Sequence, residues 1–199
     1  MLSERFNQAL VYAAQLHANQ KRKGSDVPYV AHLLGVASIV LEYGAGEDEA
    51  IAALLHDAIE DQGGPATREE IRRRFGDTVT AIVDGCTDAE TIPKPPWRQR
   101  KEAYIAHIAN ASSQVILVSA ADKLHNSRSL LKDYRLMGDA LWDRFSGGKE
   151  GTLWYYRSLV TAFRQHGTTP IIEELDRTVT ELETLAAASS LNPPLTIPG

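Results

Sequence analysis

One apolar stretch of the chain ends abruptly in four side chains that can hold a metal ion or move a proton. His56 and Asp57 follow the run Ile51–Leu55 directly, and Glu60 and Asp61 come one helical turn later. On a continuous helix, which turns by about 100° per residue, all four would share a wedge of about 140°. A solvated helix end explains a single acidic residue, but His56 and Asp57 begin inside the core, where unpaired charge is costly. A metal ion is the partner that this pattern predicts.

A second candidate carboxylate lies in the most apolar helix that the sequence predicts. Asp122 is embedded in the segment Val115–Asn126 and needs a compensating cation there. Its neighbour Lys123 points about 100° away, whereas Asn126, one turn later, shares the face of Asp122. We interpret Asp122 as a metal ligand, with a helix cap or an ion pair as the alternative.

A third candidate, His32, lies early in the apolar helix predicted after Pro28. Taken alone, a histidine on such a face is more often a core residue bonded to a carbonyl. Together the three segments offer two imidazoles and two carboxylates, a mixed set that suits Mn²⁺, Fe²⁺ or Zn²⁺ better than Mg²⁺ or Ca²⁺. The four predicted ligands are His32, His56, Asp57 and Asp122.

Helical periodicity runs through almost the whole chain, so the sequence predicts an all-α fold that positions these residues. Helices are expected around Phe6–Leu16 and Leu33–Leu41, and at about 47–60, 67–75, 77–86, 98–110, 113–133, 149–166 and 170–187, roughly eight to ten in all. Thr67 and Glu70 predict a capping box at the start of one helix. The run Val115–Val118 has the residue types of a strand, but the sequence has no second run to pair with it.

Composition limits the classes of function. The chain has 199 residues and a formal net charge of −5, which disfavours nucleic acid and anionic membranes as partners. Its single cysteine, Cys86, excludes an internal disulfide and a thiolate zinc site, and a reducing cytoplasm fits best. The sequence predicts neither a signal peptide nor a membrane span. We expect one domain over residues 1–187 and a flexible tail at 188–199.

The order H…HD…D is that of the HD phosphohydrolase superfamily. The dipeptide is extended here to HDAIED at 56–61, and Asp122 stands in ADKLHN at 121–126. In these motifs the chain resembles the hydrolase domain of the Rel/SpoT family, whose motifs read HDxxED and ADxLHN, and the resemblance covers roughly residues 5–165. It implies an HD-domain helical bundle with the metal site between helices. Because 199 residues leave no room for the synthetase domain of the long members, we expect a free-standing small alarmone hydrolase similar to the metazoan SpoT homologue.

The resemblance implies an enzyme, a Mn²⁺-dependent guanosine-3′,5′-bis(diphosphate) 3′-pyrophosphohydrolase. Such domains remove pyrophosphate from the ribose 3′ position of ppGpp and pppGpp and return GDP or GTP. The resemblance assigns the four predicted ligands to the metal. It assigns Glu60 and Asp61 to catalysis, where they can orient or deprotonate water and protonate the departing 3′-oxygen.

An acidic chain must concentrate cations locally to bind a substrate with phosphates at both ends. The substrate-binding residues that the resemblance implies are Lys21, Arg22, Lys23, Ser25, Lys94, Asn126 and Tyr155. Arg22 is expected to stack on guanine and Lys94 to bind a phosphate. Tyr155 is expected at the ribose, with Tyr156 as the alternative register. A solvated helix end is the alternative for Lys21, and a buried amide bonded to backbone is the alternative for Asn126.

Two further functions and the oligomeric state stay open at this stage. The runner-up function is the same fold and metal acting on another phosphorylated nucleotide, for example as an NADPH 2′-phosphatase. A nucleotide-binding module without turnover is the third, although intact Glu60 and Asp61 argue against it. The family usually has proline after the first metal histidine, where this chain has Leu33, so we expect a shifted helix start with ligation retained. The sequence is compatible with a monomer and with a homo-oligomer.

Overall fold

The computed structural model describes residues 1–88 and 93–191, with side chains as far as residue 188. Across these residues the regular elements are helices, and one isolated bridge pairs Lys21 with Pro28. The first helices are α1 (Glu4–Leu16), α2 (Val30–Glu42), α3 (Glu47–Leu55), α4 (Ala58–Asp61), α5 (Pro65–Phe75) and α6 (Asp77–Cys86). The remaining ones are α7 (Trp97–Ile108), α8 (Ser113–Met137), the 3₁₀ helix η1 (Gly138–Arg144), α9 (Gly148–Arg164) and α10 (Pro170–Leu191). The predicted all-α class is confirmed.

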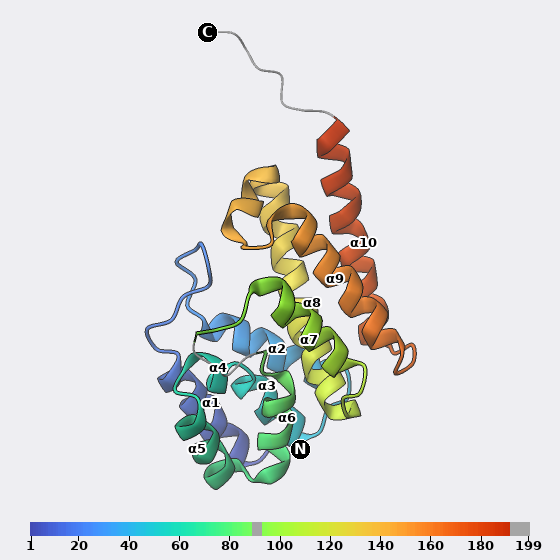
Figure 1. Cartoon of the computed structure of the whole chain (residues 1–199). Coiled ribbons are helices and arrows are strands. Elements are labelled where there is room, and N and C mark those ends of the chain that lie inside the picture. The colour runs from blue at the N-terminus through green and yellow to red at the C-terminus, as the bar shows by residue number, and fades with distance from the viewer. Residues whose placement is uncertain (89–92, 192–199) are drawn as a thin grey trace.

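The helices form two neighbouring groups joined by α8. Helices α1 to α6 gather at one end of the molecule, and α9 and α10 run beside α8 at the other (Figure 1). Helix α8 packs against α2, α3 and α6 on one side and against α10 on the other. Among the described helices, none combines the length and the apolar character needed to cross a membrane.

The two elements that carry the ligand motifs lie in the core. In α3 every residue from Ala50 to Leu55 is buried, and α8 buries Val118, Ala121 and Leu124 completely. The hydroxyl of Ser112 accepts a hydrogen bond from the backbone N–H of Val115 and so caps the start of α8. The run at 115–118 is therefore part of a buried helix, in agreement with the helix predicted at about 113–133.

The single helix predicted over 47–60 is wrong, because the chain breaks at His56 and Asp57. Helix α3 ends at Leu55 and the short α4 begins at Ala58. The ring Nδ1 of His56 lies 2.8 Å from the carbonyl oxygen of Ala53, the acceptor that a continuous helix would give to the N–H of Asp57. A side-chain donor thus replaces a backbone donor, and the two ligand residues sit in a turn between helices instead of on one helical face.

Several predicted boundaries also shift. Helix α5 begins at Pro65, because Gly64 (φ +58°) and a proline in the first turn start it before Thr67. The predicted capping box is therefore wrong: the Thr67 hydroxyl donates to the carbonyl of Gln62, and Glu70 pairs with arginines of its own helix. Helix α10 continues to Leu191, four residues past the predicted end at 187, and the rest of the expected tail lies outside the described residues.

The basic segment between α1 and α2 is a narrow loop held by backbone pairing. The N–H of Tyr29 donates to the carbonyl of Gln20, and the N–H of Arg22 donates to the carbonyl of Val27. Gly24 takes a positive φ of 72° at the tip, and a Cβ there would lie 2.7 Å from Cδ of Arg144. The loop is thereby placed against η1, next to the start of α2 that carries His32.

Candidate metal and phosphate site

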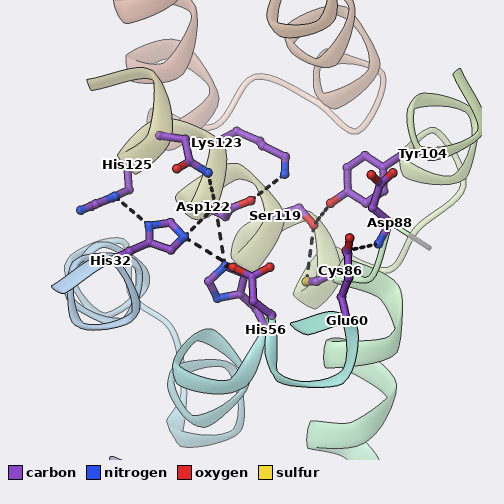
Figure 2. A network of polar contacts seen from close by, with 12 residues as sticks. His32, His56, Glu60, Cys86, Asp88, Tyr104, Ser119, Asp122, Lys123 and His125 are labelled. Atoms are coloured by element: carbon purple, nitrogen blue, oxygen red, sulfur yellow. Dashed lines mark hydrogen bonds and ion pairs between the residues drawn. The ribbon is translucent and has the colours of Figure 1, made fainter. Parts of the chain in front are cut away.

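The four predicted ligands converge between α2, α3 and α8. Nε2 of His32 lies 3.2 Å from Oδ1 of Asp122 and 3.7 Å from Oδ2 of Asp57. Nε2 of His56 lies 3.0 Å from Oδ2 of Asp57 and 3.6 Å from Oδ1 of Asp122. Figure 2 shows His32 and His56 turned toward one another, with Asp122 above both. Ligand atoms of His32, His56 and Asp57 lie within 4.8 Å of one another.

The donor set fits a divalent cation. Nε2 of His32 and Nε2 of His56 are both buried, and although they lie at ion-pair distance from Asp122 and Asp57, neither makes a well-aligned hydrogen bond, unlike most polar atoms in a protein interior. Nδ1 of His56 donates to the carbonyl of Ala53, so Nε2 is the ring nitrogen that faces the carboxylates and that would bind a metal in place of a proton. Two imidazole nitrogens and two carboxylate oxygens from separate elements form the coordination sphere of a mixed nitrogen and oxygen site.

His32 is oriented by a second histidine that sequence reasoning did not assign. Nδ1 of His32 lies 2.9 Å from Nδ1 of His125 on α8. Burial, followed by the nearby charges of His32 and Arg22, lowers the pKa of His125 to about 4, so its ring is neutral at pH 7. A neutral His125 can accept the Nδ1–H of His32, which leaves Nε2 of His32 free for a metal.

The charges of the predicted ligands shift one another's pKa values. Burial opposes charge on His56, but Asp57 and Asp122 outweigh it and raise the pKa of this imidazole. Burial likewise favours neutral carboxyls, yet His56 lowers the pKa of Asp57 and Lys123 lowers the pKa of Asp122. Both carboxylates are therefore ionised acceptors that a cation can use.

Both carboxylate oxygens of Asp122 accept hydrogen bonds from neighbouring side chains. Its Oδ2 accepts from Nζ of Lys123 at 2.6 Å, so Lys123 folds back onto its neighbour instead of pointing away as the sequence analysis expected. Its Oδ1 accepts from the Asn126 amide, whose own oxygen accepts from Arg22 at 2.7 Å. The predicted shared face of Asp122 and Asn126 is confirmed, and it links the basic loop to a predicted metal ligand.

The two expected catalytic carboxylates have different surroundings. Glu60 accepts from Nζ of Lys94 at 2.6 Å and from the N–H of Asp88 at 3.2 Å. Asp61 accepts from the amide of Gln20 at 2.8 Å. Burial and the charge of Asp57 raise the pKa of Asp61. Both carboxylates line the same cavity as Asp57 and Asp122.

Two adjoining cavities meet at the predicted ligands. The first, of about 520 Å³, reaches from His32 and His125 to Arg144 and Phe145. The second, of about 490 Å³, contains Asp57, Glu60, Asp61, Lys94 and Asp122. Several residues line both, among them Lys23, Asn126, Tyr155 and Tyr156. Each cavity has a volume typical of a small-molecule site.

Most of the predicted substrate-binding residues lie in these cavities. Arg22 and Ser25 line the first, and Lys94 lines the second. Lys21 is not among the lining residues of either cavity; its side chain is 61% exposed and pairs with Asp26 at 2.7 Å. Residues 89–92, at the start of the loop that leads to Lys94, lie outside the described part of the chain.

Sequence reasoning missed a second group of polar residues in the second cavity. Its members are Asp88, Arg100, Lys101 and Lys123. The available signal was the basic run Arg98–Lys101 that follows the proline-rich segment and opens α7. The remaining histidines make contacts outside the predicted metal cluster: His17 contacts Gln20, His107 contacts the carbonyl of Gly85, and His166 contacts the carbonyl of Ile108.

Known proteins are similar to this chain in sequence and in fold. A family model described as HD domain matches residues 9–152. The guanosine-3′,5′-bis(diphosphate) 3′-pyrophosphohydrolase MESH1 of Xenopus tropicalis is 42% identical over 126 residues, which is 62% of this chain and 68% of that protein. A GTP pyrophosphokinase rsh of Brucella ovis is 39% identical over 127 residues, covering 62% of this chain but 16% of that protein.

A solved structure extends the similarity to nearly the whole chain. The structure of a metazoan orthologue of SpoT that hydrolyses ppGpp matches with a TM-score of 0.75 and 29% identity, covering 91% of this chain and 97% of that one. The similarity that the two sequence motifs predicted is confirmed.

Proposed function

This chain belongs to the HD-domain family, and on that premise we propose that it is a metal-dependent 3′-pyrophosphohydrolase of ppGpp and pppGpp. The reaction consumes water and yields pyrophosphate with GDP or GTP. Its support is the 42% identity to the frog 3′-pyrophosphohydrolase and the similarity in fold to the metazoan ppGpp hydrolase. The proposed partner is accordingly a small guanine nucleotide.

The observation that carries the proposal is that a predicted metal site and two further carboxylates lie in one cavity. Nε2 of His32 and Nε2 of His56 face the carboxylates of Asp122 and Asp57 at 3.2 and 3.0 Å. Glu60 and Asp61 line the same cavity and are not needed to complete that set. A metal site with two spare carboxylates has the groups that phosphate-ester hydrolysis requires.

A divalent cation in this set supplies Lewis acidity, which lowers the pKa of water and offsets negative charge on a phosphoryl group. The donors, two imidazoles and two carboxylates, suit Mn²⁺, Fe²⁺ or Zn²⁺. We assign Mn²⁺, the ion that the resemblance to Rel/SpoT hydrolase domains implies. His32, His56, Asp57 and Asp122 would hold it. We also propose that the protein is cytoplasmic, since a single cysteine suits a reducing compartment.

The protein's own residues divide the proton transfers. The oxygen of water adds to the phosphorus attached to the ribose 3′-oxygen, and the bond between that phosphorus and the 3′-oxygen breaks. We assign Glu60, oriented by Lys94 and by the N–H of Asp88, to take the proton from water. Asp61, whose pKa is raised by burial and by Asp57, is assigned to protonate the departing 3′-oxygen.

The test is product analysis with metal-stripped protein. The protein is incubated with ppGpp with and without Mn²⁺, and with NADPH in parallel. We expect Mn²⁺-dependent release of GDP and pyrophosphate, much faster than release of phosphate from NADPH. Dephosphorylation of NADPH without turnover of ppGpp would overturn the proposal in favour of the 2′-phosphatase. Binding of ppGpp without any turnover would favour a nucleotide-binding module.

A further inference from the structure

Beyond the metal ligands, the second cavity is lined by cations from two helices. Arg100 and Lys101 come from α7, and Lys123 comes from α8. Nη1 of Arg100 and Nζ of Lys101 lie 2.6 and 2.7 Å from the same atom, Oδ2 of Asp88. Oδ1 of Asp88 is buried and has no hydrogen-bond partner. One carboxylate oxygen of Asp88 therefore accepts hydrogen bonds from two cations.

Lys101 and Lys123 are both largely removed from solvent, with side chains 17% and 14% exposed. Burial, followed by the positive charge of Lys123, lowers the pKa of Lys101. The negative charge of Asp88 raises the pKa of Lys101, but by less than burial and Lys123 lower it. An anion placed in the cavity would relieve the repulsion between the two ammonium groups.

Tyr155 adds an unsatisfied hydroxyl at the same place. The residue is 6% exposed, its hydroxyl has no hydrogen-bond partner, and Nζ of Lys101 lies 4.8 Å from the centre of its ring. Burial raises the pKa of Tyr155, and the positive charge of Lys123 is the main influence against it. We call Lys101, Lys123 and Tyr155 the inner wall of the site.

The neighbouring Tyr156 lines both cavities as well. Burial raises its pKa too, but the charges that act on it beside Lys123 are those of Asp122 and Arg22. Arg22 belongs to the basic loop of the first cavity and is hydrogen-bonded to Asn126. Both tyrosines line the two cavities, but it is Tyr155 whose ring lies beside Lys101 and whose hydroxyl has no hydrogen-bond partner.

We propose that the inner wall binds the terminal phosphate of the 3′-diphosphate and so selects a diphosphate over a monophosphate as the group removed. This inference rests on the proposed function. Lys123 is bonded to the metal ligand Asp122, so a diphosphate whose first phosphate lies at the ligands extends its second toward Lys123 and Lys101. Lys101 then exchanges Asp88 for a phosphate oxygen, while Arg100 keeps Asp88 paired. A single phosphate at the ligands would leave the inner wall unfilled.

The experiment compares two substrates that differ only in this phosphate. For the native protein and Lys101→Gln, kcat/KM is measured with ppGpp, and KM or an inhibition constant is measured with guanosine 5′-diphosphate 3′-monophosphate. We expect Lys101→Gln to lower kcat/KM for ppGpp by about tenfold or more, as for loss of a charge-assisted hydrogen bond. The constant for the 3′-monophosphate should stay within about twofold. Equal losses for both compounds, or no loss, would overturn the proposal.

Two further variants separate recognition from folding. Lys101→Arg keeps the charge and should keep most of the preference for a diphosphate. Tyr155→Phe removes a hydroxyl without a partner, so it should fold normally and still lose part of the preference. The matched control is Arg128→Gln, because Arg128 lies on α8, pairs with Glu174 at 3.2 Å and lines neither cavity. A preference unchanged in Tyr155→Phe would remove this residue from the inner wall.

A binding measurement distinguishes failure of this inference from failure of the proposed function. Radiolabelled pyrophosphate and phosphate are dialysed to equilibrium against the protein at one fixed concentration of free Mn²⁺. We expect the native protein to prefer pyrophosphate and Lys101→Gln to lose that preference, whether or not ppGpp is turned over. A native protein that hydrolyses ppGpp but binds both anions equally would overturn the inner wall alone. A pyrophosphate preference in a protein that leaves ppGpp intact would overturn the proposed function alone.

Discussion

Nδ1 of His32 lies 2.9 Å from Nδ1 of His125, so one imidazole orients another that belongs to the metal cluster. The contact joins α2 to α8 across the core, and Figure 2 shows His125 on the far side of His32 from His56. The absence of a side chain at Gly35 makes room for it, since a Cβ there would lie 2.3 Å from Cδ2 and Nε2 of His125. Gly35 therefore supports the metal site without contacting a metal.

Gly35→Ala should weaken metal binding. The added methyl group displaces the His125 ring, and His32 then loses the partner that sets its tautomer and orientation. Removal of such a supporting contact typically costs about 10- to 100-fold in metal affinity. Calorimetric titration with Mn²⁺ measures the affinity, and circular dichroism confirms that the helices are retained. Ser38→Ala, on the exposed side of α2, is the matched control. Native affinity in Gly35→Ala would show that His125 does not position His32.

Loss of metal and loss of turnover should separate in two variants. His56→Ala removes a ligand and should abolish Mn²⁺ binding together with activity. Asp61→Ala leaves all four ligands in place, so it should bind Mn²⁺ normally while kcat falls by about 10²- to 10⁴-fold, the usual contribution of acid–base catalysis. Metal titration and product analysis of the same samples check both results. Full activity in either variant would contradict the assignment of that residue.

Arg22→Ala should raise KM more than it lowers kcat. Arg22 lines the first cavity and not the second, which contains Glu60 and Asp61, and its Nη2 donates to the side-chain oxygen of Asn126 at 2.7 Å. Its loss removes a binding contact that the ground state and the transition state share, and we expect KM for ppGpp to rise by about tenfold. Steady-state kinetics with ppGpp measure both constants. An unchanged KM would remove Arg22 from the binding site.

Lys101 should leave a signature in the pH dependence of stability. Its pKa in the folded protein is lowered from 10.5, mainly by burial. At pH values between the lowered pKa of the folded protein and 10.5, the unfolded chain therefore binds more protons than the folded protein. In this window the stability of the native protein rises with pH because of Lys101, whereas Lys101→Gln lacks that contribution. The stability of the variant relative to the native protein should therefore be greatest near neutrality and fall as the pH approaches 10.5.

Urea unfolding of the metal-free proteins at several pH values from neutrality upward tests this dependence. Arg128→Gln serves as the control, because its exposed ion pair should give a difference from the native protein that stays nearly constant with pH. A difference for Lys101→Gln that is constant, or that grows with pH, would show that burial does not disfavour the charge on Lys101.

The sequence by itself determined the all-α class and the four predicted ligands. Both depend on relations between residues a few positions apart: apolar residues at helical spacing, and the ionisable residues His56, Asp57 and Asp122 inside apolar runs. The two motifs also determined the family resemblance. Such local patterns are readable because a charge in an apolar segment needs a partner wherever the segment packs.

Only the tertiary structure decided the helix break and the inner wall. The break at His56 depends on a side-chain bond to Ala53, which helical periodicity does not encode. The position of Lys123 depends on a flexible side chain that folds back onto Asp122. Lys101 and Tyr155 meet because α7 packs against α9, more than fifty residues later in the chain. Contacts between distant segments arise from how whole helices pack, so the residues that distinguish one phosphate from two become visible only in the folded chain.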